Sequence, residues 1–364
     1  MSLPSPARLT IDLHALAHNY AVLKAIAAGA EAAPVVKADG YGLGAGPVSR
    51  RLWAEGARRF FVARLSEGEA LRAALGPGRP ATIHVLDGFE PGAGPRLAAA
   101  ELTPVLESLP QIEAAAAFAA QRGQALTCAL QVDTGMNRQG LAVDEARALA
   151  QAPDRLRGLD VEVVMSHLGS APQPGDPRNA AQLAKFAAVR PLFPEARASF
   201  AASGGIFLGP DYRFDIVRPG ISLYGGGPEE RPDARLKAVA TLKAKVLYIR
   251  NVAAGETIGY GSSMVLDRPA RVAIVGAGYA DGVIRAGRGQ SYAWAAGARR
   301  RVLIVTMDLI AVEIGDAAVR AGDAVELMGP NVAIDEVAAA SGTVAHECLV
   351  RLNRAERVYL GEAD

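Results

Sequence analysis

Short apolar runs alternate with helical patterns along the first two-thirds of the chain. Residues 12–29 begin this part with helical spacing of their apolar positions, and Asp12 stands at the predicted helix start. Eight apolar runs of strand length follow, at residues 34–37, 60–65, 81–86, 102–106, 125–132, 161–166, 198–202 and 214–217. Segments of helical character lie between them, at 47–55, 66–74, 110–121, 143–152 and 178–189. This alternation predicts an α/β fold, a (β/α)8 TIM-type barrel. A doubly wound open sheet is the alternative, because one sequence does not reveal strand order.

The pattern changes near residue 236. Alternating or β-branched runs then dominate, at 240–252, 271–275, 302–305, 310–314 and 324–327, and only 334–340 and 345–351 look helical. This pattern predicts a mostly-β C-terminal domain of ~130 residues, a usual domain size. The glycine- and proline-rich stretch 225–232 is the expected boundary, which gives a barrel domain at 1–232 and a β domain at 233–364. The first residues are able to pair with the β domain.

Composition excludes several classes of protein. Half of the 364 residues are hydrophobic, yet no apolar run approaches the ~20 residues that a membrane helix needs. The 39 basic and 38 acidic residues nearly cancel, so neither nucleic acid nor an anionic membrane surface is an expected partner. Cys128 and Cys348 form no CxxC pair, and no metal site is indicated. The N-terminus lacks the apolar core of a signal peptide, so we expect a cytoplasmic protein.

The segment PVVKADGYGLG at 34–44 is the most informative local motif. Lys37 ends an apolar run, and a glycine-rich turn with Tyr41 follows at once. A desolvated lysine amine loses its proton more easily and can attack a carbonyl carbon. Glycines let the backbone approach an anion closely. A covalent imine to pyridoxal 5'-phosphate (PLP) needs both an amine and a phosphate seat, and a strand end with a solvent-exposed lysine is the structural alternative.

Reactive residues of a (β/α)8 barrel lie at the carboxyl ends of its strands. Five of the predicted strands end in polar or ionisable residues. The sequences at these ends are Lys37, DTGMNR at 133–138, His167 after Met165-Ser166, ASGG at 202–205 and RPG at 218–220. Their convergence on one rim predicts a catalytic mouth.

The chain resembles the alanine racemases, PLP enzymes whose barrel is followed by a β domain. Nine motifs carry this resemblance, in order: PVVKADGYGLG, QVDTGMNRQG, MSHLGS, ASGG, VRPGISLYGG, ETIGYGSSM, GYADG, TMDLIAVEIGD and ERVYLG. The resemblance spans nearly the whole chain, from Arg8 in the RLTID segment to Tyr359.

The resemblance implies a role for each matching residue. Lys37 would hold PLP as an imine and act as one proton-transfer base, and Tyr260 would be the second base on the opposite face of the cofactor. Inversion of a stereocentre needs one group to remove the α-proton and another to return it from the other side. A phenol with a reference pKa of ~10 needs cationic neighbours to act near neutrality. The family implies His167 and Arg218 as that network.

Arg218 would also face the pyridine nitrogen of PLP, where most PLP enzymes use an acidic residue. Arginine only donates, so the ring nitrogen would stay unprotonated and side reactions would be disfavoured. The residues that match the family's phosphate ligands are Tyr41, Ser203, Gly220, Ile221 and Tyr359. The residues that match its substrate and entrance positions are Arg138, Met307 through its amide, and Tyr279.

Two positions depart from the family. Gln131 stands where many members carry a carbamylated lysine that orients the arginine, and its uncharged amide could accept a hydrogen bond from Arg138. Leu43 stands where the family often has histidine. Because of Gln131, the sequence leaves open how firmly Arg138 is held and whether alanine is the preferred substrate.

The resemblance implies interconversion of L- and D-alanine, supplying D-alanine for peptidoglycan or for its catabolism. In the family, Tyr260, Tyr279 and Met307 come from a second subunit, so we expect a homodimer with shared active sites. The alternatives are a broad-specificity PLP amino acid racemase, a PLP-binding regulatory protein without turnover, and a decarboxylase. The regulatory proteins lack a β domain, and the decarboxylases place an acidic residue where Arg218 lies.

Overall fold

The structure, a computed structural model, describes residues 5–262 and 264–363, which divide into two compact units. The barrel unit comprises mainly Tyr20–Gly40 and Gly44–Leu223. The β unit comprises the described residues up to Asn19, together with Tyr41–Leu43 and Tyr224–Glu362. The second unit thus resumes at Tyr224, near the predicted boundary at 232. No helix of the described residues has the length and apolarity needed to cross a bilayer.

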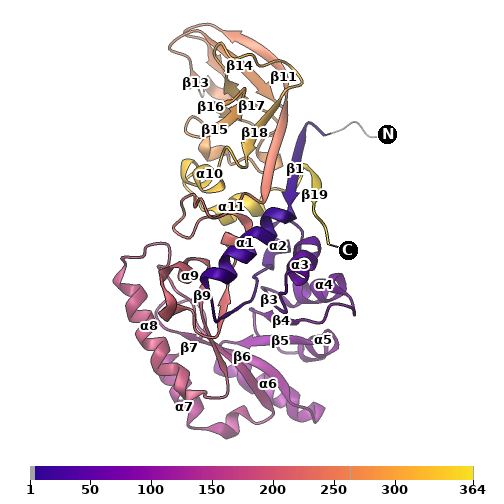
Figure 1. Ribbon diagram of the computed structural model, residues 1–364, viewed down its shortest axis with the longest axis vertical. Helices are drawn as coiled ribbons and strands as arrows, with labels where there is room; N and C mark the ends of the chain where they lie inside the picture. Colours follow the sequence, from indigo (N-terminus) through magenta and orange to yellow (C-terminus); the bar gives the residue numbers. More distant parts are fainter. Residues whose placement is uncertain (1–4, 263, 364) are drawn as a thin grey trace. The chain divides into compact units, whose positions relative to one another are not determined.

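Eight parallel strands form a nearly closed barrel, which confirms the predicted architecture (Figure 1). They are β2 (Glu31–Ala32), β3 (Arg59–Val62), β4 (Thr82–Val85), β5 (Leu102–Leu106), β6 (Leu126–Asp133), β8 (Leu159–Met165), β9 (Arg197–Ala202) and β10 (Ile216–Arg218). The sheet runs from β2 through β10 and back to β3, and a parallel bridge between Val35 and Phe61 joins its two ends. The first apolar run therefore contributes a single bridge, because β2 lies just before it. A short strand, β7 (Leu141–Ala142), adds to β6.

The helices of this part of the chain follow the predicted alternation. They are α1 (Leu13–Ile26), α3 (Ala45–Ala54), α4 (Leu65–Leu75), α5 (Gly94–Ala99), α6 (Leu109–Arg122), α7 (Val143–Ala150), α8 (Pro177–Val189) and α9 (Ser203–Leu208). The start of α1 has the expected cap. The carboxylate of Asp12 accepts hydrogen bonds from the amides of His14 at 2.9 Å and Ala15 at 3.0 Å.

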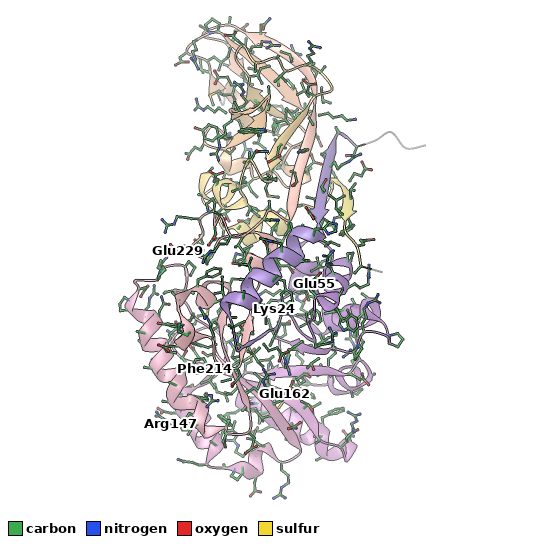
Figure 2. The ribbon with its side chains drawn as sticks, viewed as in Figure 1. Lys24, Glu55, Arg147, Glu162, Phe214 and Glu229 are labelled. Atoms are coloured by element: carbon green, nitrogen blue, oxygen red, sulfur yellow. The ribbon has the colours of Figure 1, made fainter. Side chains whose placement is uncertain are left out.

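Charged side chains gather at the amino-terminal ends of the barrel strands. Glu162 in β8, labelled in Figure 2, accepts a hydrogen bond from Arg59 Nη1 at 2.8 Å. The same Nη1 lies 2.6 Å from Nε2 of the fully buried His84. Burial lowers the pKa of His84 well below its usual value, so the imidazole is neutral and accepts this bond. Glu31 pairs with both Arg59 and Arg197. These ion pairs occupy one end of the barrel and leave the carboxyl ends of the strands for other residues.

The β unit is built on an eight-stranded sheet with the order β14-β17-β16-β15-β18-β11-β1-β19 (Figure 1). Its strands are β1 (Ala7–Asp12), β11 (Ala240–Val252), β14 (Ala270–Val275), β15 (Tyr292–Ala295), β16 (Ala298–Val305), β17 (Ile310–Glu313), β18 (Ala324–Met328) and β19 (Glu356–Leu360). A separate hairpin pairs β12 (Thr257–Ile258) with β13 (Met264–Val265). Two helices follow, α10 (Ile334–Ala340) and α11 (Ala345–Val350). The unit thus has the predicted mostly-β character.

The long strand β11 organises this sheet because it pairs with three others. It is antiparallel to β1, to β18 and to β14. The first residues of the chain thus form a strand of this unit, with β1 between β11 and β19. The sequence pattern did not predict β15, β19 or the β12–β13 hairpin.

Leu9 tests how far the unit depends on this N-terminal strand. Its side chain is fully buried in β1, opposite Leu242, whereas the neighbouring Arg8 side chain is 59% exposed. We expect Leu9→Ala to lower the free energy of unfolding by about 2–5 kcal/mol. Arg8→Ala should change it by less than about 0.5 kcal/mol. Urea denaturation of both variants checks this, and equal effects would contradict the assignment of β1 to the core.

Candidate active site

Lys37 lies at the carboxyl end of the first barrel segment, where the chain enters a left-handed turn. Ala38, Asp39, Gly40 and Tyr41 have φ angles of 51°, 55°, 63° and 56°. For residues other than glycine, this backbone conformation is less favourable by about 1–2 kcal/mol each. A run of such residues persists only where surrounding contacts fix it, and runs of this kind concentrate at functional sites.

Local hydrogen bonds hold this turn to the residues before and after it. The amide of Gly40 donates to the Val36 carbonyl at 2.9 Å, and the amide of Gly44 donates to the Asp39 carbonyl at 2.8 Å. The Asp39 carboxylate accepts a further bond from the Ala45 amide at 2.8 Å. A Cβ at Gly40 would lie 3.1 Å from the Ala45 nitrogen, so this position also needs a residue without a side chain.

The Lys37 amine is half-buried and has no hydrogen bond or ion pair among the described residues. Burial lowers its pKa, and the charge of Arg138 lowers it further. The carboxylates of Glu67 and Asp87 act in the opposite direction. A lysine with a lowered pKa and an available nitrogen is suited to nucleophilic attack on a carbonyl group.

Arg218, at the end of β10, is buried and contacts only neutral oxygen and nitrogen atoms. Its Nη1 donates to Ser199 Oγ at 2.6 Å, and its Nη2 donates to the Ser166 carbonyl at 2.6 Å. Nη2 also lies 3.4 Å from His167 Nδ1. Burial lowers the pKa of Arg218 to about 9, which leaves the guanidinium charged at neutral pH. Because a guanidinium only donates, this contact requires an unprotonated Nδ1, so a neutral His167 carries its proton on Nε2.

Ser203 lies at the start of α9, after β9, and faces the loop that follows β10. Its Oγ accepts hydrogen bonds from the amides of Gly220 at 2.9 Å and Ser222 at 3.2 Å. Both acceptor positions of the hydroxyl are therefore used, and its hydrogen is available to an anion. The structure thus brings Ser203, Gly220 and Ile221 to one place in the barrel unit.

Arg138 and Gln131 lie in and before the loop that leaves β6. Asp133 caps this loop, because its Oδ1 accepts the amides of Gly135 at 2.8 Å and Met136 at 2.9 Å. Arg138 is exposed and Gln131 is buried. Across the described part of the chain, no hydrogen bond joins their side chains, so the bond considered from the sequence is not formed here. The effect of Arg138 on the pKa of Lys37 still places its charge near the amine.

Tyr41 belongs to the β unit and packs among its aromatic residues. Its ring stacks on Tyr224 with 4.6 Å between centroids, and His346 lies 5.7 Å away at a tilt. Gly42 allows the close approach of α11, since a Cβ there would lie 2.8 Å from the Leu349 carbonyl oxygen. Burial raises the pKa of Tyr41, so its hydroxyl stays protonated. That hydroxyl has no hydrogen-bond partner among residues 5–262 and 264–363.

Tyr359 also lies near this segment. It is part of β19, and its hydroxyl donates to the Leu43 carbonyl at 3.0 Å. Tyr41–Leu43 and Tyr359 therefore form one cluster within the β unit.

Tyr260, Tyr279 and Met307 lie together on another part of the β unit. Their side chains are 86%, 43% and 53% exposed. They line an open cavity of about 580 Å³ together with Arg285, Arg288 and Asp308. The structure thus brings these three predicted site residues to one surface.

Backbone contacts fix the segments that carry Tyr279 and Met307. The Tyr279 amide donates to the Thr306 carbonyl at 2.9 Å, and the Ala280 amide donates to the Met307 carbonyl at 3.0 Å. A Cβ at Gly278 would lie 2.3 Å from the Met307 carbonyl oxygen. Only glycine fits there, which explains the first residue of the GYADG motif.

Arg354 ties these segments together by charge. It donates to both oxygens of the buried Asp281 at 2.8 and 2.7 Å, and to Asp308 at 2.6 Å. Asp281 in turn accepts the Gly278 amide at 2.9 Å. Arg354 and Ser199 lie outside the motifs, because no motif marks a residue that acts through another.

The described residues contain no group of three or more His, Cys, Asp or Glu side chains arranged to hold a metal ion. The carboxyl ends of the barrel strands instead gather Lys37, His167, Ser203, Gly220 and Arg218. This set combines a nucleophilic amine, a buried cation and hydroxyl and amide donors.

Comparison with known proteins gives one consistent result. Residues 11–228 match the model of the alanine racemase N-terminal domain, and residues 239–359 match that of the C-terminal domain. The alanine racemase of Methylobacterium sp. (strain 4-46) is 45% identical over 362 residues, which cover 98% of each chain.

Solved structures agree with the sequence comparison. The alanine racemase of Bartonella henselae with covalently bound pyridoxal phosphate has a TM-score of 0.92 and 36% identity, covering 98% of this chain and 100% of that one. The biosynthetic alanine racemase of Pseudomonas aeruginosa has a TM-score of 0.90 and 34% identity, over the same shares of the two chains. The barrel, the β domain and both halves of the sequence thus lead to one conclusion: the chain belongs to the alanine racemase family, a family of isomerases.

Proposed function

We propose that this chain interconverts L-alanine and D-alanine with PLP as its cofactor. The half-buried Lys37 amine carries the proposal, because its pKa is lowered and its nitrogen is available at the rim of the barrel. Family membership and the covalently bound pyridoxal phosphate of the Bartonella henselae relative support it. The D-alanine would serve peptidoglycan or be broken down, and we expect the reaction in the cytoplasm.

The residues of this chain fit PLP. The amine of Lys37 can capture its aldehyde carbon. For the phosphate, Ser203 has a hydroxyl hydrogen left to donate, and the buried Tyr41 has an unused hydroxyl. The Ile221 amide would add a third donor, and the Gly220 amide and the Tyr359 hydroxyl would join it once they turn from Ser203 Oγ and the Leu43 carbonyl to the phosphate. When bound, PLP withdraws electrons from the substrate α-carbon and makes its hydrogen acidic.

Arg218 would hold the ring nitrogen as a donor. Its two terminal nitrogens already bond Ser199 and Ser166, and its Nε has no partner among the described residues. A guanidinium that is charged at neutral pH would only donate a hydrogen bond, so it would keep the ring nitrogen of bound PLP unprotonated. We infer that this limits electron withdrawal to what racemisation needs.

Two bases on opposite faces would move the proton. Lys37 Nζ removes or returns the α-hydrogen of one enantiomer, and Tyr260 Oη does so for the other. Arg218 Nη2 lies 3.4 Å from His167 Nδ1, so the Arg218 charge would favour an ionised phenol through a neutral His167 that donates from Nε2. Arg138 would bind the substrate carboxylate with the Met307 amide, and Tyr279 would narrow the entrance.

A second copy of the chain is part of this proposal. Tyr260 is 86% exposed in the single chain, and Tyr279 and Met307 lie beside it on the same open surface. Large exposed side chains gathered in this way typically mark an interface. We propose a homodimer in which these residues complete the partner's site.

The dimer makes a direct prediction. Dilution of the protein below its dissociation constant should abolish racemisation, because each site would lose its second base. Analytical ultracentrifugation with activity measured at the same concentrations checks this. Full activity of a strictly monomeric preparation would contradict the shared site.

The activity itself is tested by a visible spectrum and chiral analysis. The purified protein should absorb in the visible range, and L-alanine should be converted to a mixture with D-alanine. Lys37→Ala should lose the visible band and nearly all turnover, because the amine that would form the imine is removed. A Lys37→Ala protein that keeps both would refute the assignment.

Tyr260→Phe separates the two bases. It removes only a hydroxyl, so the cofactor should remain bound with an unchanged spectrum. Turnover should fall more in the L-to-D direction than in reverse if Lys37 serves the D enantiomer. Initial rates from each enantiomer, with deuterium at the α-carbon, measure the effect. Small and equal losses in both directions would contradict the two-base mechanism.

A broad-specificity amino acid racemase is the second candidate. Gln131 carries no charge and makes no hydrogen bond with Arg138 in the described structure, which weakens the hold on the substrate carboxylate. Comparable rates on alanine, serine, arginine and lysine would favour this reading over an alanine racemase.

A further inference from the structure

The carboxylate of Glu67 binds three backbone amides that belong to two different strand ends. Oε1 accepts the Ala38 amide at 2.9 Å. Oε2 accepts the amides of Ala63 at 2.8 Å and Arg64 at 3.2 Å. Glu67 lies in the first turn of α4, so the bond to Arg64 caps its own helix. The bond to Ala38 reaches a segment 29 residues earlier in the chain.

Ala38 is the residue that follows Lys37 and the first of the four left-handed residues. The direction of the Lys37 side chain depends on the backbone at this junction. Asp39 is tied to the chain after the turn, at Gly44 and Ala45, and Gly40 is tied to Val36 before it. The Glu67 carboxylate is the contact that ties Ala38 to a neighbouring strand of the barrel.

We propose that Glu67 is a positioning residue that holds the backbone next to Lys37 and thereby aims its amine. The inference rests on the proposed role of Lys37 as cofactor anchor and base. Glu67 does not touch substrate, and it acts only through the Ala38 amide and through its charge.

The charges that face Lys37 give the proposal a second readout. Arg138 lowers the pKa of the amine, whereas Glu67 and Asp87 raise it. Removal of the Glu67 charge leaves Arg138 opposed by Asp87 alone. The amine then loses its proton at a lower pH, so the acidic limb of the activity profile should move to lower pH.

Three variants separate geometry, charge and helix capping. Glu67→Gln removes the charge, and its single carbonyl oxygen cannot bond both strand ends. Glu67→Asp keeps the charge but is one methylene too short to span both. Glu145→Gln is the matched control, because the Glu145 carboxylate caps α7 through the Ala142 amide at 2.8 Å and makes no contact with the turn.

Hydrogen exchange of the 36–44 segment, followed by mass spectrometry, tests the hold on the turn without reference to activity. We expect faster exchange in Glu67→Gln and Glu67→Asp and no change there in Glu145→Gln. In the enzyme assay, kcat of both Glu67 variants should fall about 10- to 100-fold with little change in KM. The acidic limb should shift in Glu67→Gln and stay in place in Glu67→Asp.

The outcomes are distinct. Unchanged exchange of the 36–44 segment in both Glu67 variants would overturn the proposal. So would a loss of kcat no larger than that of Glu145→Gln, since Glu67 would then only cap its helix. If Glu67→Gln does not fold, Glu67→Asp decides through the same exchange measurement. If the wild-type protein does not racemise alanine, the proposed function fails, while the exchange data still test the hold on Ala38.

Discussion

The left-handed turn after Lys37 is the constraint on which the proposed chemistry depends. Four consecutive residues take a left-handed conformation that only glycine adopts without a cost in free energy, and just one of them is glycine. Such a turn does not form by local preference, so the barrel must impose it. The strained turn thus fixes the backbone that directly follows the Lys37 side chain.

Arg218 shows a second constraint, the burial of a cation without a carboxylate. A buried charge is stable only when its donors are satisfied, and Arg218 uses Ser199 Oγ and the Ser166 carbonyl. A carboxylate partner would neutralise the guanidinium and remove its field from the site. Neutral acceptors leave the positive charge in place. The same charge favours an anionic ligand nearby.

The sequence predicted the barrel and the β domain because both rest on periodic burial, which apolar residues record directly. It did not predict β15, because the turn to β16 uses Ala296 and Gly297 at φ angles of 48° and 73°, and alanine is no turn signal. Ala38 and Asp39 likewise gave no sequence signal for the left-handed turn, because tertiary contacts impose that conformation. Motifs located the residues at the strand ends. They could not locate Glu67 or Arg354, whose roles exist only through the segments that folding brings beside them.

The two proposed bases lie in opposite environments. Lys37 is half-buried, and its surroundings already favour the loss of a proton. The Tyr260 side chain is 86% exposed. An exposed phenol acts as a base more readily when cations lie near it, and Arg285 and Arg288 line the same cavity as Tyr260. In the proposed dimer, the buried Arg218 guanidinium of a second copy would add its positive charge to theirs.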